Sequence, residues 1–154
     1  MHISHAVYPL ICRWTLGLCP LLVIMNNTAI TWRIIADCGF TSPTEIWKHV
    51  AREGMHLPFL ITDLYSRILC KRMIGVSPAS YSTVDALRKN KVPVLFIHGQ
   101  DDSFVPVSMT KENYEACAAP KEIMIVPGAI HGMSYAVAKE AYEEKERQFW
   151  VRYD

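Results

Sequence analysis

The chain has 154 residues, of which 51% are hydrophobic and 20% are charged, and its formal net charge is +1. This length suits one domain with its own hydrophobic core. Because the charge is nearly balanced, we expect neither a nucleic-acid partner nor an anionic membrane partner, since either usually leaves a basic excess.

The five cysteines are odd in number and widely scattered: Cys12, Cys19, Cys38, Cys70 and Cys117. They form no CxxC pair and no cysteine–histidine spacing typical of zinc, so we predict neither a metal site nor a disulfide framework. Reduced, mostly buried thiols favour a cytoplasmic location.

An apolar run over residues 16–25 is too short to span a bilayer, and a poor signal-peptide cleavage site follows it.

A regular pattern of elements begins at Arg33. Residues 33–38 form a short apolar run that predicts a buried strand. The Ser-Pro-Thr-Glu sequence at residues 42–45 then predicts a helix start, with the serine as cap, the proline at the first helical position and the glutamate completing a capping box. We expect this helix to end at Gly54.

The sequence predicts further helices before the next strand. Apolar residues recur at helical spacing over residues 57–76, and a short helix is expected at residues 84–87. Residues 43–90 are therefore predicted to be a helical insertion between two strands.

The strongest strand pattern lies at residues 92–97. These residues are apolar without alternation, as expected for a strand that is covered on both faces. A helix over residues 107–118, a strand over residues 123–126 and a charged amphipathic helix over residues 137–150 are expected to follow. This order predicts an α/β fold with a parallel sheet and flanking helices.

Two polar loops directly follow the last two predicted strands. The first contains Asp102 and the second contains His131. Ligands bind at the C-terminal ends of parallel strands, so adjacent strands would present both loops side by side. An aspartate that orients a histidine is typical of nucleophilic hydrolases. Taken alone, Asp101 and Asp102 also suit a turn, and His131 also suits an ordinary loop position.

The motifs in these loops resemble a known family. HGxxDxxVP at residues 98–106, followed by GxxH ending at His131, resembles the acid and histidine segments of serine-type α/β-hydrolases. IIADCGFTSP at residues 34–43 resembles the sixth strand and following turn of a bacterial branch related to serine aminopeptidases and prolyl-oligopeptidase-like hydrolases. The resemblance covers about residues 33–152. It implies that Asp102 is the triad acid and His131 the general base.

Three other residues in these motifs have structural interpretations. His98 is predicted to brace the acid loop. Asp37 is expected to serve a turn or a buried hydrogen bond, and Cys38 is expected to lie in the core.

No nucleophile is recognisable in the sequence. The family places it on a Gly-x-Ser-x-Gly elbow, which would lie near Arg13, and no serine is found there. Cys19 is a weak substitute, because Pro-Leu follows it instead of the x-Gly that an elbow requires. Ser42 is better explained as a helix cap, and Ser103 sits beside the acid.

The N-terminal part of the chain departs from the family pattern. We predict an atypical segment over residues 1–32 and a C-terminal α/β-hydrolase portion over residues 33–154. A fragmentary gene, an internal start or a frame error would each produce this pattern, and we expect the chain to be truncated and inactive alone. A homodimer or a partner chain is expected to cover the exposed edge of the sheet.

The resemblance implies hydrolysis of an ester, amide or small peptide bond through a covalent acyl-enzyme, with no metal and no organic cofactor. The insertion over residues 43–90 would form a cap above the site. Three of its aromatic residues suit either an acyl pocket or the core: Trp47, Phe59 and Tyr65. The alternative function is a non-catalytic interaction or binding module derived from a hydrolase, which the missing elbow supports.

Overall fold

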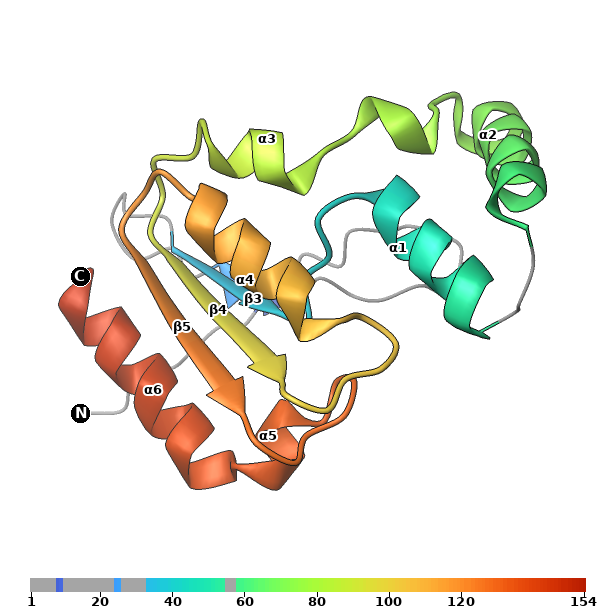
Figure 1. Cartoon of the computed structure of the whole chain (residues 1–154). Helices are drawn as coiled ribbons and strands as arrows, with labels where there is room; N and C mark the ends of the chain where they lie inside the picture. The colour runs from blue at the N-terminus through green and yellow to red at the C-terminus, as the bar shows by residue number, and fades with distance from the viewer. Residues whose placement is uncertain (1–7, 10–23, 26–32, 55–57) are drawn as a thin grey trace.

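The structure is a computed structural model, and it describes residues 8–9, 24–25, 33–54 and 58–154 (Figure 1). Within the first 32 residues it contains the antiparallel pair β1 (Tyr8–Pro9) and β2 (Ile24–Met25). Cys19 and the expected elbow position near Arg13 lie outside the described residues. The boundary at residue 33 therefore stays a prediction.

The predicted parallel sheet is confirmed. Its strands are β3 (Ile34–Asp37), β4 (Val94–Gly99) and β5 (Lys121–Val126), in the order β3-β4-β5. Both neighbouring pairs are parallel. β5 begins two residues before its apolar pattern, because Lys121 and Glu122 pair with β4 through their backbones.

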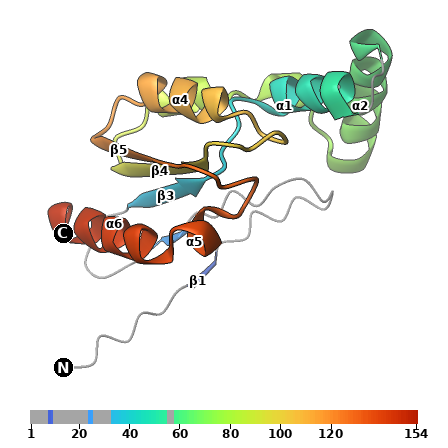
Figure 2. The ribbon, with the colours of Figure 1, turned by 60° about the horizontal axis from the view of Figure 1, so that its bottom comes forward.

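Helices cover both faces of the sheet. Figure 2 shows α4 (Val107–Ala116) on one face and α6 (Lys139–Arg152) on the other. All six residues of β4 are buried, which explains its unbroken apolar pattern. Alternate strand residues enter two core clusters: Ile35, Leu95, Ile97 and Val126 pack with Phe149 of α6, and Ala36, Val94 and Phe96 pack with Cys117 at the end of α4.

The stretch between β3 and β4 is helical, as predicted. It contains α1 (Pro43–His49), α2 (Phe59–Ile74) and α3 (Thr83–Leu87). A π-helical turn continues α1 to Gly54, and a 3₁₀ turn over Pro78–Ser80 precedes α3. α2 lies beyond α1, away from the sheet (Figure 1). Among the described helices, none has both the length and the apolar character needed to cross a membrane.

The predicted cap of α1 is present. Ser42 Oγ accepts a hydrogen bond from the Glu45 N–H at 3.1 Å, and Pro43 opens the helix. Removing such a cap usually costs about 1 kcal/mol. We therefore expect Ser42→Ala to lower the free energy of unfolding by about 1 kcal/mol in urea titrations, and Ser42→Asp to restore most of it. Ser108→Ala, at an exposed position of α4, is the control; an equal loss there would contradict the capping role.

The prediction of one helix over residues 137–150 was wrong at its start. A separate short helix, α5 (Ser134–Val137), precedes α6, and Ala138 breaks the two with φ −133° and ψ 49°. Four residues are too few to show helical periodicity in a sequence. Consequently α5 could not be recognised from its pattern.

Candidate active site

The structure brings Asp102 and His131 together. β4 and β5 are adjacent and parallel, so the loops that follow them lie at the same end of the sheet (Figure 1). His131 Nδ1 lies 2.7 Å from Asp102 Oδ2. The predicted juxtaposition of these loops is therefore confirmed, whereas the catalytic roles of the two residues stay a prediction.

Asp102 is fully buried and surrounded by hydrogen-bond donors. Its Oδ1 accepts from the backbone N–H groups of Phe104, at 2.9 Å, and Val105, at 2.8 Å. Its Oδ2 faces His131 Nδ1, and His98 Nε2 lies 3.2 Å away. A carboxylate needs donors on both oxygens when it is buried, and the loop supplies them. This bonding fixes the direction of the Asp102 carboxylate.

His98 braces the acid loop, as predicted. Its side chain is completely buried, and its Nε2 lies 2.8 Å from the Val105 carbonyl oxygen and 3.2 Å from Asp102 Oδ2. Because both oxygens are acceptors, Nε2 carries a proton. Nδ1 lies 2.6 Å from Thr110 Oγ1 on α4. His98 therefore fastens the acid loop to a helix.

The loop that carries His131 depends on glycine and on contacts with the acid loop. Gly128 and Gly132 have φ values of 75° and 69°, in the left-handed region. The Ala129 carbonyl accepts from the N–H of Asp101 at 3.0 Å, which ties this loop to the acid loop. The His131 ring also packs against the Phe104 ring, with centroids 5.0 Å apart.

The state of the His131 ring follows from its partner. The ionised Asp102 carboxylate only accepts, so His131 Nδ1 donates to it and Nε2 keeps its lone pair when the ring is neutral. The His131 side chain is 28% exposed. The arrangement therefore offers a fixed, partly accessible base.

Asp37 forms the buried hydrogen bonds that were expected of it. Its Oδ1 accepts from the Cys38 thiol and its Oδ2 from the Tyr142 hydroxyl, both at 3.2 Å. Burial raises the pKa of the Asp37 carboxyl. Tyr142 was not singled out by the sequence, because it lies 105 residues away on α6 with no motif around it.

Cys38 is buried, as predicted, and it is a poor nucleophile. Burial, assisted by the neighbouring Asp37 charge, raises the pKa of its thiol to about 12. A thiol with this pKa carries almost no thiolate at neutral pH. Cys38 therefore does not replace the missing serine.

Two serines of the described chain are unsuited to act as the nucleophile. Ser42 is a helix cap, as expected. Ser134 lies in Gly-Met-Ser-Tyr-Ala, which resembles an elbow motif, but it is completely buried at the start of α5. Burial of this kind prevents attack on a substrate. The expected elbow position and Cys19 lie outside the described residues.

The aromatic residues of the insertion have different surroundings. Trp47 Nε1 donates to the Thr62 carbonyl at 3.1 Å and thereby links α1 to α2. Tyr65 is 62% exposed, so the alternative that it is a core residue was wrong. The side chain of Phe59 is outside the described part of the structure.

One buried trio within the described residues has the ligand types of a metal site. Ligand atoms of Cys38, His98 and Asp102 lie within 4.8 Å of one another. However, a metal ion on His98 Nε2 would require loss of the proton that faces Val105, and it would compete with His131 for Asp102. His98 and Asp102 are thus already used by hydrogen bonds within the acid loop and to His131, and Cys38 bonds Asp37 and the Gly132 N–H.

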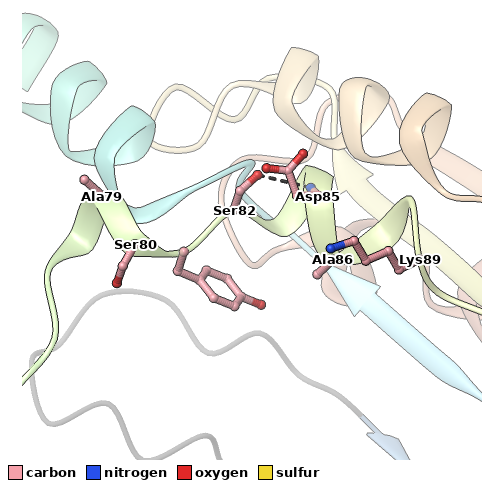
Figure 3. Close-up of a pocket in the computed structure, with 7 residues that line it drawn as sticks. Ala79, Ser80, Ser82, Asp85, Ala86 and Lys89 are labelled. Carbon is pink, nitrogen blue, oxygen red and sulfur yellow. Dashed lines mark hydrogen bonds between the residues drawn. The ribbon is translucent and has the colours of Figure 1, made fainter.

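A surface hollow lies elsewhere in the molecule. Figure 3 shows it between the 3₁₀ turn and α3, where Ser82 caps α3 by accepting from the Asp85 N–H. Its lining includes Tyr81 and Lys89 but neither Asp102 nor His131. The hollow is therefore separate from the candidate active site.

No family model matches the chain. It is similar to the uncharacterized protein YqkD of Bacillus subtilis, with 31% identity over 115 residues that make up 75% of this chain and 38% of YqkD. Among solved structures, an esterase from Pyrococcus furiosus aligns with a TM-score of 0.55 and 20% identity, over 77% of this chain and 44% of the esterase. The acylaminoacyl peptidase of Pyrococcus horikoshii aligns with a TM-score of 0.52 and 18% identity, over 77% of this chain and 20% of the peptidase.

The parallel sheet, its flanking helices and these structural similarities define the class of the fold. The chain has a partial α/β-hydrolase fold. It spans less than half of each of these relatives.

Proposed function

We propose that the chain supplies the acid and the general base of a serine-type hydrolase that cleaves ester, amide or small peptide bonds. The observation that carries this proposal is the 2.7 Å hydrogen bond between His131 Nδ1 and the buried Asp102 Oδ2. His131 Nε2 would take the proton of a hydroxyl nucleophile and return it to the leaving group. Asp102 would orient the ring and stabilise the imidazolium.

Other observations support the substrate class and the setting. The Pyrococcus proteins are named an esterase and an acylaminoacyl peptidase, which supports an ester or peptide substrate. The motif at residues 34–43 supports the serine aminopeptidase and prolyl-oligopeptidase-like branch. Cys38, Cys70 and Cys117 carry thiols, which supports a reducing, cytoplasmic location.

The proposed reaction also needs a nucleophile. We assign it either to residues 1–32 or to a second chain, since Ser42 is a helix cap and both Ser134 and Cys38 are buried. A second chain, whether another copy or a different protein, would also cover the edge of the sheet. A nucleophile supplied in either way would explain why Asp102 and His131 are paired in a chain that has no recognisable nucleophile elbow.

The test is covalent labelling by a fluorophosphonate probe, read by intact mass. The full chain is labelled alone and after mixing with the part of YqkD that lies outside the matched segment. Both samples are repeated with His131→Ala and with His49→Ala as the matched control, because the His49 ring contacts the acid loop at the Ser103 carbonyl and bonds neither Asp102 nor His131 in the described structure. Circular dichroism verifies that every variant is folded.

We expect an adduct that is lost in His131→Ala and kept in His49→Ala, and peptide mapping then names the nucleophile. The absence of an adduct both from the chain alone and from the mixture, on folded protein, overturns the proposal. That outcome would leave the non-catalytic binding module as the function to pursue.

A further inference from the structure

Cys38 has an unusual backbone conformation directly after β3. Its φ is 55°, in the left-handed region that favours glycine, and it is the non-glycine residue with positive φ among those described. The Cys38 N–H donates to the Ile97 carbonyl of β4 at 3.0 Å. Thr110 Oγ1 of α4 donates to the Gly39 carbonyl at 3.1 Å. The turn is thus held from two sides, and such strain is retained where the surroundings impose it.

The Cys38 side chain connects this turn to the loop that carries His131. The Gly132 N–H donates to Cys38 Sγ at 3.4 Å, across 94 residues of sequence. The thiol in turn donates its proton to Asp37 Oδ1 at 3.2 Å. Sulfur therefore acts as acceptor towards the loop and as donor towards the end of β3.

The connection continues into α6. Tyr142 donates its hydroxyl proton to the second oxygen of Asp37 at 3.2 Å. As a result, Cys38 and Asp37 together connect Tyr142 of α6 to Gly132 through three hydrogen bonds. Asp102 fixes the imidazole ring at Nδ1, while Cys38 fixes the backbone immediately after the same histidine.

We propose that Cys38 is a positioning residue for His131: its thiol, placed by a left-handed turn at the end of β3, holds the backbone that sets the direction of the imidazole. The inference rests on the proposed function for its catalytic meaning. Its structural part is the claim that the Cys38 thiol holds the Gly132 backbone and thereby the direction of His131. Substrate does not contact Cys38, because the residue is 3% exposed.

The test measures hydrogen exchange by NMR in the full chain, so it needs no activity. Two protons report the positioning: the His131 Nδ1 proton, identified by its loss in His131→Ala, and the Gly132 amide proton. Cys38→Ala is expected to speed exchange of both protons by about tenfold, as for the loss of one ordinary hydrogen bond. Cys38→Ser keeps a group that both accepts and donates, so both rates are expected to stay close to those of the unmodified chain.

Two further variants separate positioning from stability. Cys38→Gly suits the left-handed backbone, so it is expected to melt at or above the temperature of Cys38→Ala while exchanging as fast. Cys117→Ala removes another buried thiol, which packs in the core cluster with Ala36 and Phe96 and whose Sγ lies 3.8 Å from Asn90 Nδ2. It is expected to leave both reporter protons unchanged.

The proposal is overturned if folded Cys38→Ala exchanges both protons at the original rates, or if Cys117→Ala accelerates them equally. This result would leave the proposed function intact, since labelling by the fluorophosphonate probe judges that separately. Conversely, a chain that fails to label can still show the exchange pattern. The two failures are therefore distinguishable.

Discussion

Asp102→Asn is expected to lower hydrolysis, or the rate of probe labelling, by about 10⁴-fold while leaving the fold intact. The amide oxygen can still accept from the N–H groups of Phe104 and Val105. The amide nitrogen would then face His131 as a donor. It would place the imidazole proton on Nε2, so the ring could no longer act as the base.

The measurement for this substitution combines activity with imidazole nitrogen NMR. The nitrogen shifts report which ring nitrogen carries the proton, even in a chain without activity. Asp101→Asn is the matched control, because Asp101 is exposed and differs from Asp102 by one position. If Asp101→Asn removed the function and Asp102→Asn did not, the assignment of the acid would be wrong, and the turn interpretation of Asp102 would be preferred.

Gly99→Ala is expected to destabilise the protein by about 2–4 kcal/mol and to displace the His131 loop. A Cβ atom at Gly99 would lie 2.3 Å from the Ala129 carbonyl oxygen and 2.9 Å from that of Ile130. Both are backbone atoms. The loop cannot simply retreat, because the Asp101 N–H is bonded to the same Ala129 oxygen.

Urea unfolding of Gly99→Ala measures the loss of stability. Exchange of the His131 Nδ1 proton measures the displacement of the loop. Gly54→Ala provides the control: the nearest atom to its added Cβ is Val50 Cγ1 at 3.9 Å, so a change within about 0.5 kcal/mol is expected. Equal stability of the two variants would show that the His131 loop adapts, and the close packing of the two loops would then not be required.

Much of the fold could be predicted because local patterns are strong where both faces of the sheet are covered. The apolar run at residues 92–97 predicts β4, since a strand between two helical layers has no polar face. The cap at Ser42 also lies in the sequence, because the serine and its N–H partner are three residues apart. Order along the chain then places the acid loop and the His131 loop after successive strands.

The sequence by itself determined the three strands of the parallel sheet, the helical insertion and the two loops that carry Asp102 and His131. It did so through periodicity and motif spacing, which are properties of neighbouring residues. Only the tertiary structure decided how Cys38 and Tyr142 support the end of β3, because their partners are about a hundred residues away. It also decided the separate helix α5, since four residues are too few to show helical periodicity. The break at Ala138 arises where the chain turns to pack α6 against the sheet.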